Sequence, residues 1–291
     1  MKIALFGRKF EEKCFDPVRD IIGLLNDRGV EIIIFEDFHE FLIQKKIIDK
    51  SYTTFKDNGI LNEGDFLISL GGDGTLLEAV TIVQHKEIPI LAINAGRLGF
   101  MAATPIEAGV KGVESLLDDK YVIENRNLVC CKTDSKLFGE LNFGLNELAL
   151  QKRDTSSMIV IHAYLDGEFL NSYWVDGLIV STPTGSTGYS LSCGGPLMMP
   201  ITNNFILAPV NPHNLNVRPL IVPDSSVLTL EVEGRSAKVL LSLDSRSVSV
   251  PMKTRITVSK ADFSCKLVQV EGYSYFNTLR SKLNWGLDTR N

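Results

Sequence analysis

The sequence has no uninterrupted apolar run near the ~20 residues that a membrane-spanning helix needs, so we expect no transmembrane segment and no membrane partner. It also lacks a basic excess, because 30 lysines and arginines stand against 35 aspartates and glutamates, for a net charge of −5. Nucleic-acid-binding domains usually carry a basic surface, so this balance argues against a dedicated nucleic-acid binder. A phosphate-bearing ligand would need local hydrogen-bond donors or a metal ion, since the overall field is mildly repulsive.

Cysteine and histidine are too scattered to indicate a disulfide framework or a metal cluster. The five cysteines are odd in number and show no C-x-x-C spacing, and the four histidines show no metal-ligand spacing. Reduced thiols and solvated or hydrogen-bonded histidines are therefore expected. The first apolar stretch is too brief for a signal peptide and predicts a strand, so we expect a cytoplasmic protein.

The remaining composition is typical of a globular chain, with 44% hydrophobic and 22% charged residues in 291. Strand-like and helix-like segments alternate over residues 1–120, which predicts an α/β domain with a mostly parallel sheet. In the first strand–helix–strand segment of this domain, Asp16 is expected as the helix N-cap, Pro17 as the first helical residue and Gly29 as the residue that ends the helix.

Residues 121–275 change to short segments of alternating hydrophobicity, which predict a β-rich, β-sandwich-like domain. The dipeptide Asp166-Gly167 predicts a hairpin turn. The tail, 276–291, carries large apolar groups and is expected to pack back on the α/β domain. The expected strands in this region cover 121–123, 141–150, 158–165, 178–181, 227–232, 239–243, 256–258 and 265–270.

The sharpest motif is Gly71-Gly72-Asp73-Gly74-Thr75, between a predicted strand at 65–70 and a predicted helix at 76–85. Glycines allow close backbone approach, and a helix start supplies N–H groups that suit phosphate oxygens. A carboxylate in such a loop would repel phosphate unless it held a metal ion or faced a hydroxyl that loses its proton, which points to phosphoryl transfer. The alternative is a tight turn with Asp73 as a helix N-cap.

Three further segments are less specific on their own. The run 94–100 lies at the end of a predicted strand, where it forms either one wall of a ligand pocket or an ordinary connection from strand to loop. Asn146-Glu147 offers groups for an adenine edge and ribose hydroxyls, although a surface-facing strand end is the favoured interpretation of this segment alone. The run 176–192 is rich in Ser, Thr and Gly and suits a polar, sugar- or purine-like ligand or a loop without one. The segment 244–246 follows a predicted strand and could approach a ligand, but a simple turn is its default interpretation.

Taken together, these segments resemble the NAD kinase family, the ATP-dependent NAD⁺ 2′-kinases, in its bacterial form. The resemblance spans nearly the whole chain. The glycine-Asp loop alone is moderately specific, since lipid kinases and phosphofructokinases carry similar loops, whereas 176–192 together with Asn146-Glu147 is highly specific. The matching pieces are 71–75, 94–100, 146–147, 176–192 and 273–285.

The resemblance implies transfer of the γ-phosphoryl group of ATP to the 2′-hydroxyl of the adenosine ribose of NAD⁺, with Mg²⁺ carried by the nucleotide phosphates. It implies a homodimer or homotetramer with the NAD site near a subunit interface. By the same resemblance Asp73 is the general base or hydroxyl-orienting group, and the phosphate loop is formed by Gly71, Gly72, Gly74 and Thr75. The implied NAD-binding residues are Phe100, Asn146, Glu147, Asp176, Thr184, Thr187, Gly188, Tyr189, Ser190, Leu191, Ser192, Asn211 and Arg246.

Three departures from familiar members leave donor choice and NADH acceptance open: Gly188 replaces a common Ala, Glu78 a basic residue, and Ser245 a His. Two alternatives also stay open. A lipid kinase would share the loop but would need an apolar acceptor pocket, which the polar run 184–192 does not favour. A non-catalytic NAD(P)-binding sensor would not need a carboxylate beside phosphates.

Overall fold

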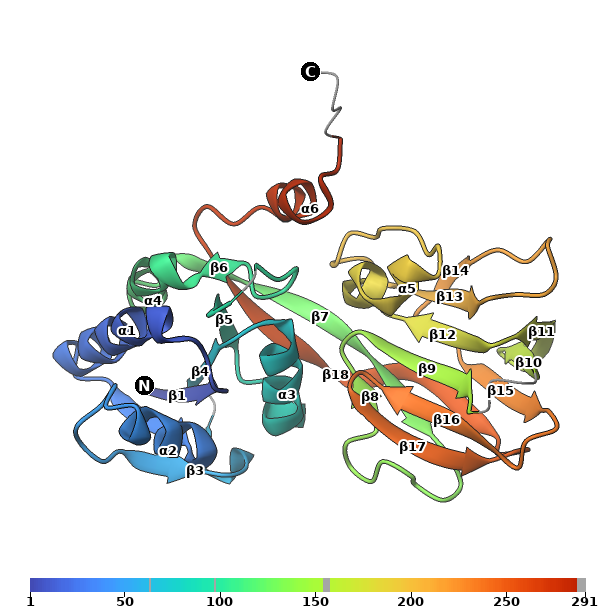
Figure 1. The fold of residues 1–291 in the computed structure, drawn as a ribbon, viewed down its shortest axis with the longest axis horizontal. Helices are drawn as coiled ribbons and strands as arrows, with labels where there is room; N and C mark the ends of the chain where they lie inside the picture. Colours follow the sequence, from blue (N-terminus) through green and yellow to red (C-terminus); the bar gives the residue numbers. More distant parts are fainter. Residues whose placement is uncertain (63, 97, 154–157, 287–291) are drawn as a thin grey trace. The chain divides into compact units, whose positions relative to one another are not determined.

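The computed structural model describes residues 1–62, 64–96, 98–153 and 158–286, which form two compact units (Figure 1). Unit 1 comprises 1–125 and 265–291, and unit 2 comprises 126–264. The described part of the tail is thus counted in unit 1, while 287–291 lie outside the described residues. The expected boundaries at 120/121 and 275/276 lie five and eleven residues away from these, and the expected division stays a prediction.

Unit 1 is built on a parallel sheet with the strand order β5–β4–β1–β2–β3, as expected for its α/β pattern. The chain runs from β1 through β2 to β3 on one side, then crosses back to β4 and β5 on the other. The order therefore reverses between β1 and β4, and ligands of open α/β sheets bind beyond the carboxyl ends of strands at such a point. The strands are β1 (Lys2–Gly7), β2 (Glu31–Phe35), β3 (Thr53–Phe55), β4 (Phe66–Leu70) and β5 (Ile90–Asn94), and β6 (Thr104–Pro105) and part of β18 (Ile256–Val270) pair with β5.

Helices cover this sheet, and its side chains are buried on both faces. Ile3 and Leu5 belong to a core with the apolar faces of α1, α2 and α4, while Ala4 and Phe6, which point the other way, are also fully buried. The helices are α1 (Phe15–Asp27), α2 (Glu36–Gln44), α3 (Asp73–Val83), α4 (Gly109–Leu117) and α6 (Tyr275–Leu283). No helix among the described residues is both long and apolar enough to cross a membrane.

The predicted start of the first helix was wrong. Helix α1 begins at Phe15, with Cys14 at the N-cap, so Asp16 lies inside the first turn. Pro17 is tolerated as the third helical residue because N–H groups of the first turn have no partner within the helix. The stop was confirmed, since Gly29 follows the helix with φ of +68°.

Unit 2 is antiparallel and β-rich, as expected. One sheet has the order β14–β13–β12–β9–β16–β17, and the other contributes β11–β10–β15–β18. Side chains from both sheets form one core, which includes Leu148 and Leu178 from the first and Ile161 and Leu230 from the second. The strands are β7 (Tyr121–Lys132), β8 (Phe143–Gly144), β9 (Glu147–Lys152), β10 (Ile159–Leu165), β11 (Glu168–Val175), β12 (Gly177–Ser181), β13 (Asn204–Val210), β14 (Leu220–Pro223), β15 (Leu228–Glu233), β16 (Lys238–Leu243), β17 (Arg246–Pro251) and β18.

The hairpin at Asp166-Gly167 was confirmed, because both residues have positive φ between the paired strands β10 and β11. Two other expectations were wrong in detail. The strand expected over 141–150 is interrupted at 145–146, between β8 and β9. The two strands expected at 256–258 and 265–270 are parts of the single long strand β18.

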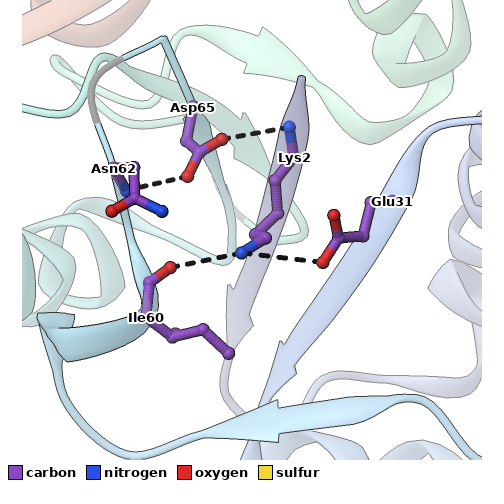
Figure 2. A network of polar contacts seen from close by, with 5 residues as sticks. All are labelled: Lys2, Glu31, Ile60, Asn62 and Asp65. Atoms are coloured by element: carbon purple, nitrogen blue, oxygen red, sulfur yellow. Dashed lines mark hydrogen bonds and ion pairs between the residues drawn. The ribbon is translucent and has the colours of Figure 1, made fainter.

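A buried carboxylate fixes the amino-terminal edge of the unit 1 sheet (Figure 2). Asp65 is 7% exposed, and its two oxygens accept hydrogen bonds from the backbone N–H groups of Lys2 at 3.1 Å and Asn62 at 2.8 Å. The Lys2 ammonium group contacts the carbonyl of Ile60 at 3.3 Å and the carboxylate of Glu31 at 3.6 Å. This network ties β1 to the segment that leads into β4.

We predict that Asp65→Ala lowers the free energy of unfolding by about 1–3 kcal/mol, because two backbone donors lose their acceptor. Urea unfolding measures the change. Glu31→Gln is the matched control: it removes only the exposed end of the Lys2 ion pair and should cost less than about 1 kcal/mol. Equal effects of the two substitutions would contradict the role given to Asp65.

Candidate functional site

The glycine-Asp loop lies where the strand order of unit 1 reverses. Strand β4 ends at Leu70, and Gly72 is the N-cap of α3, so the interpretation of Asp73 as N-cap was wrong: Asp73 is the first helical residue. A Cβ atom at Gly71 would lie 2.2 Å from Oγ1 of Thr75, which explains the glycine there. Apart from adjacent residues and the backbone of α3 itself, no atom of the described residues lies within 4 Å of a Cβ built at Gly72 or Gly74, so the backbone of this helix start is open to a ligand.

The Asp73 carboxylate accepts three hydrogen bonds from consecutive backbone N–H groups. Oδ2 accepts from Phe100 at 2.8 Å, and Oδ1 accepts from Met101 at 3.1 Å and Ala102 at 2.9 Å. The carboxylate reaches these groups because position 99 is glycine: a Cβ atom at Gly99 would lie 2.0 Å from Oδ1. The structure therefore brings the first two sequence motifs together.

Asn94 closes the same loop from the end of β5. Its Oδ1 accepts from the Gly96 N–H at 2.7 Å, and its Nδ2 donates to the Ala102 carbonyl at 3.1 Å. Helix α6 adds a contact, because the Lys282 ammonium lies 5.5 Å from the centre of the Phe100 ring. Arg97, in the middle of the motif, lies outside the described residues.

In unit 2 a second carboxylate organises the segment around Asn146 and Glu147 in the same manner. Asp244 accepts from the backbone N–H of Leu145 at 2.8 Å, Asn146 at 2.8 Å and Glu147 at 3.1 Å. Burial raises the pKa of Asp244, and these N–H donors and Arg246 act against that rise. Asp244 thus fixes the backbone from which Asn146 and Glu147 project.

Glu147 carries an unusual carboxyl group. Burial, and then the nearby charge of Asp244, raise its pKa from 4.5 to about 7, while the backbone N–H of Tyr189 lowers it. Its Oε2 is buried and has no hydrogen-bond partner among the described residues. A ligand hydroxyl would supply the missing donor.

The Ser/Thr/Gly-rich loop packs directly on this segment. The Thr182 N–H donates to the Asn146 carbonyl at 2.8 Å, and a Cβ atom at Gly185 would lie 2.1 Å from the same carbonyl oxygen. A Cβ at Gly188 would lie 3.2 Å from Oε2 of Glu147. The third and fourth sequence motifs therefore form one surface.

That loop also contains buried hydroxyls without partners. Oγ1 of Thr184 and Oγ of Ser190 are buried and have no hydrogen-bond partner in the described parts of the chain. Thr184 is at the start of a 3₁₀ turn (Thr184–Thr187), in which Thr187 Oγ1 donates to the Thr184 carbonyl at 3.3 Å. The short helix α5 (Tyr189–Ser192) follows and contains Ser190 and Leu191. A polyhydroxylated ligand would satisfy these groups.

Asp176 lies at the other end of β12 and is linked to the loop through Tyr189. It pairs with Lys152 at 2.6 Å and accepts from Asn211 at 3.2 Å, and the Lys152 bond is the main cause that lowers the pKa of Asp176. Gln151, next to Lys152, donates to the Tyr189 hydroxyl at 2.7 Å.

Arg246 has a different set of contacts. Its guanidinium donates to the backbone carbonyls of Leu141 and Phe143 and lies 5.5 Å from the centre of the Phe143 ring. Burial lowers its pKa. In this structure Arg246 supports the segment before Asn146, and its place at the ligand stays a prediction.

Sequence reasoning missed several residues that shape these two surfaces. Gly99 lies inside the motif 94–100, but glycine is required at this position because of Asp73, which is distant in the sequence. Asp244 looked like a turn residue because nothing local shows that it faces 145–147. Lys152 and Gln151 lie on β9 beside Gly177 of β12, and only strand pairing reveals that proximity.

Comparison with known proteins shows the family to which the chain is related. The family described as "ATP-NAD kinase N-terminal domain" matches residues 16–121, and "ATP-NAD kinase C-terminal domain" matches 145–270. The chain is similar to the NAD kinase of Cytophaga hutchinsonii, with 52% identity, and to that of Flavobacterium johnsoniae, with 44%. Both matches cover 100% of each chain.

Two solved structures share the fold. An NAD kinase from Archaeoglobus fulgidus in complex with ATP has a TM-score of 0.77 and 25% identity, covering 98% of this chain and 99% of that one. Yeast NADH kinase complexed with NADH has a TM-score of 0.87 at 23% identity, covering 99% of this chain and 89% of that one, and shows the fold alone.

We predict that Glu147 makes the unliganded protein less stable as pH rises. An acid whose pKa is raised by folding binds more protons in the folded state, so its contribution is present below the unfolded pKa of 4.5 and is lost as pH rises towards about 7. The free energy of unfolding should fall by on the order of 3 kcal/mol through this window, relative to Glu147→Gln. Urea unfolding of both proteins from pH 4.5 to 8 measures it. Parallel curves would contradict the assignment.

Proposed function

The chain belongs to the NAD kinase family and is a phosphotransferase, and we propose that it transfers the γ-phosphoryl group of ATP to the 2′-hydroxyl of the adenosine ribose of NAD⁺. The products are ADP and NADP⁺. The observation that carries this proposal is the Asp73 carboxylate, positioned by three N–H groups in the first turn of α3, in a chain that matches NAD kinases over its full length. The donor is supported by a relative solved with ATP.

Asp73 is proposed to orient the acceptor hydroxyl and take its proton. An ionised carboxylate has about four acceptor positions, of which the backbone N–H groups occupy three and leave one for a hydroxyl. As the 2′-oxygen forms its bond to the γ-phosphorus, the bond from that phosphorus to the bridging oxygen breaks and ADP leaves. The transition state is loose, so position and charge matter more than a strong base.

The surface in unit 2 is proposed to hold NAD⁺. Glu147 would accept a hydrogen bond from a ribose hydroxyl, and Asn146 would contact the adenine edge. Buried hydroxyls of Thr184 and Ser190 supply further groups that lack partners among the described residues. The remaining proposed contacts are Phe100, Asp176, Thr187, Gly188, Tyr189, Leu191, Ser192, Asn211 and Arg246.

We propose that magnesium is carried mainly by the phosphates of the nucleotide substrate. Mg²⁺ is commonly bound by phosphate oxygens with few protein carboxylates, and when bound it neutralises phosphate charge. The open helix start at Gly72 and Gly74 offers N–H groups to the same phosphates.

Two further expectations, on cellular location and on oligomeric state, complete the proposal. We propose a cytoplasmic enzyme, because the reaction draws on the ATP and NAD⁺ of the cell interior. We also propose a homodimer or homotetramer. Exposed apolar side chains on the edge strands of unit 2 support it: Phe169 and Trp174 on β11, and Leu220 and Ile221 on β14.

The alternatives are not favoured. A lipid kinase would share the glycine-Asp loop, but both family domains match the NAD kinases across the chain. A non-catalytic sensor would bind NAD(P) without turnover, so the activity assay separates it from the proposed enzyme.

We predict that the purified protein forms NADP⁺ from NAD⁺ only when ATP and Mg²⁺ are both present, and that EDTA stops the reaction. An NADP-specific dehydrogenase detects the product. NAD⁺ binding by calorimetry without NADP⁺ formation would overturn the proposed activity in favour of a sensor or a different donor.

We predict that Asp73→Asn lowers kcat by at least about 10³-fold while the Kd for NAD⁺ changes by less than about fivefold, because the substitution removes a proton acceptor from the reacting hydroxyl. Asn94→Ala is the matched control, since it loosens the same loop and leaves the carboxylate in place. A loss of kcat by Asn94→Ala as large as that by Asp73→Asn would show that Asp73 acts only by holding the loop.

A further inference from the structure

Arg8 lies beside the glycine-Asp loop, where the strand order reverses. Strands β1 and β4 are parallel neighbours, and Gly7 at the end of β1 is opposite Leu70 at the end of β4. Arg8 and Gly71 therefore leave the sheet side by side. After β1 the chain continues to β2 on one side of this pair, whereas after β4 it continues to β5 on the other side. Ligands of α/β sheets bind where the strand order reverses in this way.

The guanidinium of Arg8 is directed to the helix that begins in the loop. Its Nε lies 2.6 Å from the Glu78 carboxylate on α3, and its Nη1 lies 3.5 Å from Asp37 on α2. Side chains of a helix point towards its N-terminus, so Glu78 lies over the turn that contains Gly74 and Thr75. Arg8 is thus held next to the first turn of α3.

The carboxylates around this turn oppose phosphate binding unless a cation such as Arg8 lies close to them. Asp73 and Glu78 place two carboxylates on the first two turns of α3, and both repel a polyphosphate. The Arg8 side chain is 48% exposed and that of Glu78 is 43% exposed, so their ion pair is weak and readily exchanged. A planar guanidinium binds phosphate oxygens through two parallel hydrogen bonds, which makes phosphate the stronger partner.

We propose that Arg8 is a phosphate-binding residue of the donor site, held in place by Glu78 and Asp37 until the triphosphate of ATP takes over its guanidinium. The proposal rests on the proposed kinase function and adds a residue that none of the sequence motifs contains. It assigns Glu78 a second effect: this carboxylate competes with the triphosphate for Arg8, so removing its charge strengthens donor binding.

The test measures equilibrium binding of the non-hydrolysable analogue AMP-PNP with Mg²⁺, by calorimetry at saturating NAD⁺. We expect Arg8→Gln to raise the Kd about tenfold, since it removes a charge-assisted pair of hydrogen bonds. Glu78→Gln should lower the Kd about threefold, because Arg8 no longer has to leave a competing carboxylate before it binds the triphosphate. Lys9→Gln, the matched control at the next residue, changes the net charge equally and should stay within about twofold.

The double variant separates contact from neutralisation. If Arg8 touches the triphosphate, Arg8→Gln with Glu78→Gln binds more weakly than the wild type. If Arg8 only cancels the charge of Glu78, the double variant, which has the same net charge as the wild type, binds as well as the wild type, and the proposal is overturned. An unchanged Kd in Arg8→Gln overturns it too.

Two controls protect the interpretation. AMP, which lacks the β- and γ-phosphates, should bind wild type and Arg8→Gln alike, and an equal loss for AMP would show that the substitution disturbs the fold or the adenine contact instead. The wild type is first assayed for NADP⁺ formation. Its failure there counts against the proposed function, whereas normal turnover with an unaltered Arg8→Gln variant counts only against Arg8.

Discussion

A carboxylate that accepts hydrogen bonds from three consecutive backbone N–H groups organises each half of this protein. Asp73 holds the backbone of residues 100–102 in unit 1, and Asp244 holds that of 145–147 in unit 2. Irregular segments beside a ligand site lack the ladder bonds of sheets and helices, so their N–H groups need another acceptor. One ionised side chain satisfies three of them and fixes the segment, and glycine at position 99 makes the contact possible in unit 1.

This solution has a chemical cost that the rest of the site offsets. Carboxylates at a helix start oppose the binding of phosphates, although the helix dipole and the open N–H groups favour it. In the proposed reaction the carboxylate has a purpose, because a ribose hydroxyl loses its proton as it attacks. The proposed site would then use cations, Mg²⁺ with the nucleotide and the guanidinium of Arg8, to offset the carboxylate charge.

Periodicity and turn chemistry predicted the α/β region, the β-rich region and the loop around Asp73, because these depend on local patterns. The start of α1 was placed two residues too late, because proline is tolerated throughout the first turn of a helix and does not mark its first residue. Contacts between distant segments were beyond a single sequence: nothing near Asp244 shows that it faces 145–147. Helix α2 was not predicted although Phe38, Phe41 and Leu42 have helical spacing, because no polar N-cap residue and no glycine stop mark its ends.

If NAD⁺ binds at Glu147 as proposed, the raised pKa of this residue links dinucleotide binding to proton release. A carboxyl group that titrates near pH 7 is partly protonated in the empty protein, and a ribose hydroxyl that donates to it favours the ionised form. Binding then releases part of a proton to the solvent. In the proposed binding mode, the apparent affinity for NAD⁺ consequently rises with pH through neutrality.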